Sequence, residues 1–113
     1  MRVSMALPEI DETDVRAVVD VLKSGRLALG PKSEEFEYAI AEYVGVRHAV
    51  AVSSGTAALH LIVKALGIEP GDEVIVPSFT FVASVNVLLY EGATPVFADV
   101  EPETYNIDPS DVE

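Results

Sequence analysis

Two serines, a glycine and a threonine stand together inside the segment AVAVSSGTAALHLIVKALG, residues 49–67. Small strand-forming residues precede them, and a helical apolar pattern follows. The first N–H groups of a helix lack intrahelical acceptors and lie at the positive end of its dipole, so this turn can attract an anion. Gly55 lets the backbone approach a ligand closely, and the hydroxyls can donate hydrogen bonds. The turn therefore predicts a phosphate site without a Lys or Arg; the alternative is that Ser54 or Thr56 merely caps the helix.

A second turn of similar composition, VPSFTFVAS, spans residues 76–84. It sets Phe79 and Phe81 beside Ser78 and Thr80 at the expected mouth of a sheet, where open α/β folds bind ligands. A flat ring near an anion site suggests a flat, phosphorylated ligand held by stacking. Taken alone, this turn favours the plainer interpretation that both phenylalanines belong to the core.

Two amphipathic helices are expected ahead of these turns. Asp11 and Ser33 are the predicted N-caps, and Gly25 and Gly45 the predicted ends. The link SGRLALGPK, residues 24–32, has glycines and a proline and is typical of an ordered loop.

From His48 onward, predicted strands and helices alternate. We expect strands at 48–54, 72–78 and 93–100, and helices at 56–66 and 81–90. Ser78 follows Ser53 by the same interval that separates Gly92 from Gly67, which indicates two βαβ units in one register. This order predicts an α/β fold with a parallel sheet covered by helices. The helix at 56–66 is apolar on nearly every side, so we expect it to be sandwiched between other elements rather than to lie on a surface. Its polar strip consists of Thr56, His60 and Lys64.

A further N-cap is expected at Asp108, followed by Pro109 at the first helical position.

The composition excludes several classes of protein. The formal net charge of −12, with seven scattered Lys and Arg residues, argues against a nucleic-acid partner. The absence of cysteine rules out disulfides, thiolate metal sites and a cysteine nucleophile. His48 and His60 are not spaced as a metal pair, so we expect no metal and a structural role for both. The N-terminus lacks the apolar run of a signal peptide, and the longest apolar stretch is too short for a membrane span. We therefore expect a soluble, cytoplasmic protein.

Together, the motifs resemble the DegT/DnrJ/StrS family of sugar aminotransferases, which use pyridoxal 5′-phosphate (PLP). Four stretches carry the resemblance in order: LPEIDETDVRAVVDVLKSGRLALGP, FEYAIAEYVGVRHAVAVSSGTAALHL, LGIEPGDEVIVPSFTFVAS and GATPVFADVEPETYNIDP. The resemblance implies the N-terminal part of the large domain of a fold-type-I PLP enzyme, a three-layer αβα structure with a mostly parallel sheet. It divides the chain into an N-terminal helix with an entrance loop, 1–32, and the first part of the PLP-binding domain, 33–113, which we expect to be truncated at its C-terminus.

The same resemblance implies roles for particular residues. Gly55, Thr56 and Ala57 match the segment that holds the PLP phosphate, and Phe81 matches the aromatic residue that stacks on the pyridine ring. A further segment matches the lining of the substrate entrance near the dimer interface; it consists of Leu27, Ala28, Leu29, Gly30 and Pro31.

The residues that perform the chemistry are expected outside this chain. Lys23, Lys32 and Lys64 do not match the family lysine, which we expect downstream of Glu113, and Asp99 does not match the partner of the pyridine nitrogen. The 113-residue chain alone should therefore be inactive. The implied topology also separates its first strand from the next two, so the isolated chain should be molten or aggregated because its strand edges lack partners.

The function implied by the resemblance is transfer of an amino group, with glutamate as donor, to a keto-sugar nucleotide in polysaccharide or antibiotic sugar biosynthesis. The enzyme would be a homodimer. Two alternatives stay open. One is a PLP- or PMP-dependent sugar dehydratase of the same family, in which histidine replaces the lysine. The other is a non-catalytic module that binds a phosphorylated ligand.

Overall fold

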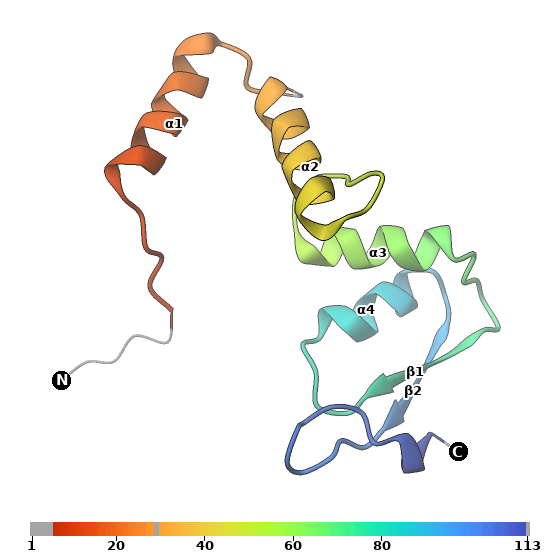
Figure 1. Ribbon diagram of the computed structural model, residues 1–113. Helices are drawn as coiled ribbons and strands as arrows, with labels where there is room; N and C mark the ends of the chain where they lie inside the picture. Colours follow the sequence, from red (N-terminus) through yellow and green to blue (C-terminus); the bar gives the residue numbers. More distant parts are fainter. Residues whose placement is uncertain (1–5, 29, 113) are drawn as a thin grey trace. The chain divides into compact units, whose positions relative to one another are not determined.

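The computed structural model of the protein describes residues 6–28 and 30–112 (Figure 1). Contacts divide the described residues into two compact units, one ending at Ala51 and the other beginning at Val52. The functional division between residues 32 and 33 stays a prediction. In the described ranges, no helix is both long and apolar enough to cross a membrane.

The first unit begins with helix α1 (Glu12–Ser24), which starts and ends as predicted. The Asp11 carboxylate accepts hydrogen bonds from the N–H groups of Thr13 at 2.6 Å and Asp14 at 3.1 Å, and the Asp14 carboxylate accepts from the Asp11 N–H in return. These bonds satisfy the N–H groups that the helix itself cannot. Gly25 closes the helix with a φ of +69°.

Helix α2 (Pro31–Val44) begins two residues earlier than Ser33, so that predicted N-cap is wrong. Gly30 takes the N-cap position and Pro31 the first helical position, where the missing N–H of proline costs nothing. A Cβ at Gly30 would lie 2.5 Å from the Arg26 carbonyl oxygen, so only glycine fits there. The predicted end at Gly45 is confirmed, with a φ of +77°.

The strand expected at 48–54 is wrong: in the described chain these residues form no strand. A strand requires a neighbouring strand that shares its backbone hydrogen bonds. The segment instead has a side-chain contact, in which the Ala51 N–H donates to Glu37 Oε1 at 2.8 Å.

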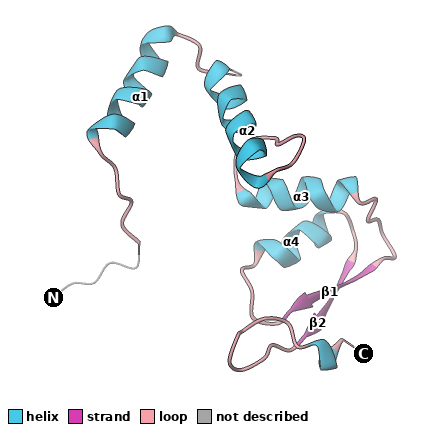
Figure 2. Ribbon diagram, in the orientation of Figure 1, coloured by secondary structure: helices cyan, strands magenta, loops and turns pink. Residues whose placement is uncertain are grey.

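The second unit contains a parallel βαβ arrangement, as the sequence predicted. Strands β1 (Glu73–Pro77) and β2 (Thr94–Ala98) pair in parallel, with Glu73 opposite Thr94 and Pro77 opposite Ala98. Helix α4 (Ala83–Tyr90) connects them and packs on both strands, and helix α3 (Gly55–Ala65) packs on α4 (Figure 2). The α/β class is thus confirmed. The core of this unit consists of Val63, Val76, Val87, Leu88 and Ala93, with Ile68, Val74 and Val85 packed against it.

Helix α3 is not sandwiched within this unit, contrary to the sequence prediction. Val63 is buried, whereas Leu61 and Ile62 remain 52% and 55% exposed. The reason is that α4 covers one face of α3 and the second unit contains no other element that covers the opposite face in the described chain. An apolar sequence cannot by itself supply that second packing partner.

Both predicted glycine ends are confirmed. Gly67 and Gly92 have φ values of +76° and +78°, in the left-handed region that glycine enters without strain. After α4, the Gly92 N–H donates to the Leu89 carbonyl and the Ala93 N–H to the Leu88 carbonyl. These paired bonds satisfy carbonyl groups that the helix leaves open.

The C-terminal N-cap is also confirmed. Asp108 accepts from the Ser110 N–H at 2.8 Å and caps the short 3-10 helix η1 (Pro109–Asp111). Hydrogen bonds from the hydroxyl and N–H of Ser110 lower the pKa of the Asp108 carboxyl. Between β2 and η1, Val100 and Ile107 form an isolated antiparallel bridge.

Candidate functional site

A hollow of about 470 Å³ lies where the second unit brings the starts of α3 and α4 together. It is lined by Gly55, Thr56, Ala58, Leu59, Phe81 and Ala83. Three of the four residues predicted to bind a cofactor therefore meet at one place, although Gly55 and Thr56 begin α3 and Phe81 lies on the loop before α4. The fourth, Ala57, is not part of this lining.

Two N–H groups at the start of α3 are available to a ligand. Ser54 caps the helix: its hydroxyl accepts from the Ala57 N–H, and its carbonyl accepts from the Ala58 N–H, both at 3.1 Å. Within the described chain, the N–H groups of Gly55 and Thr56 have no acceptor. The helix-cap interpretation is therefore correct for Ser54. The cap nevertheless leaves the N–H groups of Gly55 and Thr56 free to bind an anion. The Ala57 N–H, by contrast, is already engaged.

Gly55 is not required by the backbone conformation of its turn. It is not among the glycines with positive φ, so the backbone does not require glycine there. A Cβ built on Gly55 would meet no described atom within 4 Å. What glycine provides is the absence of a side chain at the helix start, which leaves the Gly55 and Thr56 N–H groups accessible.

Phe81 is 75% exposed and forms a wall of the hollow. Phe79 is 68% exposed, so the interpretation of both rings as core residues is wrong in this structure. The β1 strand ends at Pro77 and α4 begins at Ala83, which leaves both rings on the connecting loop. Phe79 instead packs against Tyr105, with ring centroids 5.6 Å apart.

Asp99 belongs to the bonds that secure the end of β2. Its backbone N–H donates to Asp111 Oδ2 at 2.6 Å, and its own carboxylate accepts from the Val100 N–H at 2.8 Å. The Ser78 hydroxyl approaches Asp99 Oδ1 at 3.4 Å, a long contact. These bonds give Asp99 a structural role at the end of β2.

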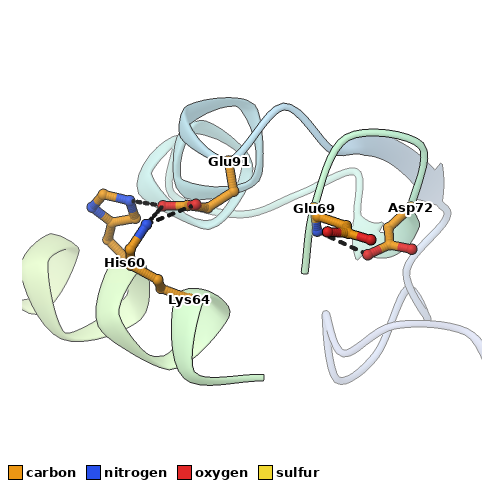
Figure 3. A network of polar contacts seen from close by, with 5 residues as sticks. All are labelled: His60, Lys64, Glu69, Asp72 and Glu91. Carbon is orange, nitrogen blue, oxygen red and sulfur yellow. Dashed lines mark hydrogen bonds and ion pairs between the residues drawn. The ribbon is translucent and has the colours of Figure 1, made fainter. Parts of the chain in front are cut away.

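The basic side chains of the polar strip on α3 bind a single carboxylate (Figure 3). His60 Nε2 donates to Glu91 Oε1 at 2.6 Å, and Lys64 Nζ lies 3.1 Å from Glu91 Oε2. These two hydrogen bonds, the one from His60 first, lower the pKa of the Glu91 carboxyl. Lys32 is paired with Glu35 on α2. Lys64 does not line the hollow, and no three His, Asp or Glu side chains among the described residues form a group that could hold a metal ion.

The predicted entrance segment lies in the first unit. Leu27 is exposed, Gly30 is buried, and Pro31 begins α2. Ala28 is exposed on the loop, and Leu29 lies outside the described residues. A role at a substrate entrance stays a prediction for all five residues.

The parallel βαβ unit, with an exposed ring and a helix start carrying two open N–H groups near the carboxyl end of a strand, defines an α/β protein whose hollow can accept an anionic ligand. Residues 8–113 match the DegT/DnrJ/EryC1/StrS aminotransferase family, and the chain belongs to this family.

Individual relatives agree with this membership. The chain is 50% identical over 108 residues to the spore coat polysaccharide biosynthesis protein SpsC of Bacillus subtilis (strain 168), covering 96% of this chain and 28% of that protein. It is 46% identical over 113 residues to GDP-perosamine synthase of Caulobacter vibrioides, covering 99% of this chain and 30% of that protein.

Among solved structures, the PLP form of Spr1654 from Streptococcus pneumoniae, assigned as a sugar aminotransferase, superimposes with a TM-score of 0.94 at 39% identity. The superposition covers 99% of this chain and 29% of that structure. The same protein is solved in a PMP form. The fold is therefore that of fold-type-I PLP aminotransferases, and the chain spans less than a third of the length of these relatives.

Sequence reasoning missed two kinds of residue. Leu59 and Ala83 line the hollow, and helical spacing from Gly55 was the available signal for Leu59. Glu91, the partner of His60 and Lys64, had no signal in the sequence because it lies on another helix.

Proposed function

We propose that this chain contributes the phosphate- and ring-binding part of the cofactor site in a PLP-dependent aminotransferase. The observation that carries the proposal is the hollow that unites the Gly55 and Thr56 N–H groups with the exposed ring of Phe81. Membership of the aminotransferase family and the PLP and PMP forms of Spr1654 support it.

The residues present fit the chemistry of this cofactor. A phosphate dianion is suited to two open N–H groups at a helix start, where the helix dipole is positive. The Thr56 hydroxyl can add a third hydrogen bond. Phe81 offers a flat apolar face to a pyridine ring, and the missing side chain at Gly55 keeps the approach to the amides clear.

PLP, when bound, supplies an electron-withdrawing ring that makes bonds at the attached amino-acid carbon easier to break. The residues of this chain bind and orient that ring. Gly55 and Thr56 would hold its phosphate end, and Phe81 would cover one of its faces and exclude water from it. Proton transfer requires a basic side chain close to the reacting carbon. Lys64 is paired with Glu91 and does not line the hollow, and neither Lys23 nor Lys32 matches the family lysine, so we assign that lysine to a part of the enzyme beyond residue 113.

We propose further that the acceptor is a keto-sugar nucleotide, the donor is glutamate, and the enzyme is a cytoplasmic homodimer. Two relatives support the acceptor class by name, GDP-perosamine synthase and the UDP-4-amino-4-deoxy-L-arabinose–oxoglutarate aminotransferase of Shewanella sediminis. The name of the second also pairs the amino-transfer reaction with oxoglutarate, the keto acid of glutamate.

The test is a PLP titration of the complete gene product, followed by addition of glutamate. We expect the absorbance of a PLP complex, its conversion to the PMP form by glutamate, and its restoration by a keto-sugar nucleotide. A complex that does not respond to glutamate would favour the dehydratase or the non-catalytic module. No complex at all would contradict the proposal.

Variants of the hollow sharpen this test. Gly55→Ala should leave the unfolding midpoint unchanged, because its Cβ meets no described atom, yet weaken PLP binding by obstructing the amides. Phe81→Leu should weaken PLP binding about tenfold, corresponding to loss of roughly 1.4 kcal/mol of ring contact. The matched control is Phe79→Leu, which removes a ring of similar exposure that packs on Tyr105. Equal loss in both phenylalanine variants would contradict the assigned role of Phe81.

A further inference from the structure

The carboxylate of Glu91 joins the two helices whose starts form the hollow (Figure 3). Besides the bond from His60 Nε2 at 2.6 Å, Glu91 receives two from Lys64 Nζ, at 3.3 Å to Oε1 and 3.1 Å to Oε2. The His60 ring also meets the Tyr90 ring edge-on, with centroids 5.4 Å apart. His60, Lys64 and Glu91 are called the clasp below.

The clasp differs from an ordinary surface ion pair. Its carboxylate is shielded, since the Glu91 side chain is only 16% exposed, while those of His60 and Lys64 are 38% and 64% exposed. Its two partners stand one helical turn apart on the same face of α3, so both reach it without strain. Partial burial reduces screening by solvent, which makes such a pair count for more than an exposed one.

Glu91 is itself firmly anchored. It is the C-cap residue of α4, and its N–H donates to the Leu88 carbonyl at 3.1 Å. Leu88 and Ala93, on either side of it in the chain, belong to the buried core. Gly92, the next residue, approaches Pro70 so closely that a Cβ there would lie 2.9 Å from Pro70 Cγ. The clasp therefore attaches α3 to a fixed point of the second unit.

Apart from the clasp, helix α3 is attached within that unit by the face that packs on α4. Val63 is its buried residue among those described, and Leu61 and Ile62 are exposed. A helix that packs by one face alone can tilt or rotate on that face, unless a second contact prevents this. His60 and Lys64 flank Val63 and supply that second contact.

A displacement of α3 would change the hollow directly. Thr56 is one turn before His60 on the same strip of the helix, about 6 Å along its axis at 1.5 Å per residue. Gly55, Thr56, Ala58 and Leu59 move with α3, whereas Ala83 begins α4 and Phe81 lies on the loop directly before it. The relative position of the two helices thus sets the separation between the open N–H groups and the Phe81 ring.

We propose that Glu91, through His60 and Lys64, is a positioning residue that sets the separation of the phosphate-binding and ring-binding walls of the hollow. The inference rests on the proposed function for its ligand, PLP. Its structural part, the attachment of α3 by the clasp, does not depend on that ligand.

The experiment compares the complete gene product with its Glu91→Ala variant in two measurements. In cofactor-free protein, hydrogen exchange of peptides covering residues 55–64 should become faster while exchange in the β1 and β2 strands stays unchanged. In titrations below the unfolding transition, the dissociation constant for PLP should rise about tenfold. Glu91→Gln, which keeps the shape and one acceptor oxygen but loses the charge, should give a smaller rise.

The matched control is Glu35→Gln, which removes a carboxylate from the Lys32–Glu35 pair within α2. It should change neither measurement. If Glu91→Ala does not fold, Glu91→Gln and His60→Gln provide the same readouts with milder changes. A merely structural role would lower the unfolding midpoint and leave the PLP affinity of the folded protein intact.

The outcomes separate the two proposals. Unchanged exchange at 55–64 together with unchanged PLP affinity would overturn the positioning role of Glu91 and leave the cofactor assignment standing. Absence of PLP binding in the wild type would overturn the cofactor assignment, and with it the ligand named here. Faster exchange in Glu91→Ala would then still support the clasp as the attachment of α3.

Discussion

The segments 48–67 and 73–92 follow the same order of residue types but differ in what holds them. The first has a turn capped by Ser54, and α3 starts at the next residue. The second begins with a paired strand, and α4 starts at Ala83 without a side-chain cap in the described chain. Ala83, Val87 and Leu88 are buried in the second helix, whereas Val63 is the buried residue of the first. Local hydrogen bonds thus define α3, and packing defines α4.

The largest expected difference concerns core packing. Leu88→Ala should lower the free energy of unfolding by about 2–5 kcal/mol, because it leaves a cavity in the core. Leu61→Ala, the same change on the exposed side of α3, should cost under about 1 kcal/mol. Denaturant unfolding of both variants of the complete gene product measures the difference. A loss of equal size at Leu61 would show that another part of the protein covers that side of α3.

The glycines that end the two helices provide the next test. Gly67→Ala should cost about 1–2 kcal/mol, since an alanine there must adopt a left-handed conformation. Gly92→Ala carries the same penalty and should cost about 1–3 kcal/mol more, because its Cβ would overlap Pro70. Gly67 is the matched control, as a Cβ there meets no described atom within 4 Å. Equal losses in the unfolding midpoints would exclude the Pro70 contact as a constraint.

The serines of the two turns should differ by a smaller amount. Ser54→Ala removes an N-cap and should destabilise α3 by about 1 kcal/mol, visible as faster hydrogen exchange in residues 57–64. Ser78→Ala removes only a long contact to Asp99 and should change stability by less than about 0.5 kcal/mol. An equal effect at Ser78 would mean that the second turn is also held by its side chain.

The smallest expected effect is the pH dependence of the clasp. Because hydrogen bonds from His60 and Lys64 lower the pKa of Glu91 below its ordinary value of 4.5, the unfolded state binds the proton more readily. The clasp therefore stabilises the fold above pH 4.5, and this contribution is lost as the pH falls through the lowered pKa. The unfolding midpoints of wild type and Glu91→Gln should converge as the pH falls from 4.5 through the lowered pKa of Glu91. A constant difference across this range would contradict an ionised Glu91.

Much of the fold could be predicted because the decisive interactions are short-range. The Asp11 cap, the glycine ends at residues 25, 45, 67 and 92, and the parallel pairing of β1 with β2 are confirmed. Ser33 was wrong as an N-cap because Gly30 and Pro31 provide an equally good start two residues earlier. The strand at 48–54 was wrong because strand propensity does not supply a neighbouring strand.

The candidate site was predictable to a similar extent. The residue types of the Ser54–Thr56 turn indicated an anion site, and the structure leaves the Gly55 and Thr56 N–H groups open for one. The sequence could not decide whether Ser54 or Thr56 caps the helix. Only the structure shows that the Ser54 hydroxyl accepts from the Ala57 N–H and so occupies that group. The glutamate that receives His60 and Lys64 could not be identified, since any of several acidic residues had suitable charge.

The sequence by itself determined where the described helices end, the parallel βαβ order and the turn suited to a phosphate. These features depend on backbone conformation and hydrogen bonds within a few residues. Tertiary structure alone decided that Leu59 and Ala83 complete the hollow around Gly55, Thr56 and Phe81, and that Glu91 binds the polar strip of α3. Both depend on how α3 packs against α4, and that packing depends on side-chain shapes in a core drawn from four separate segments.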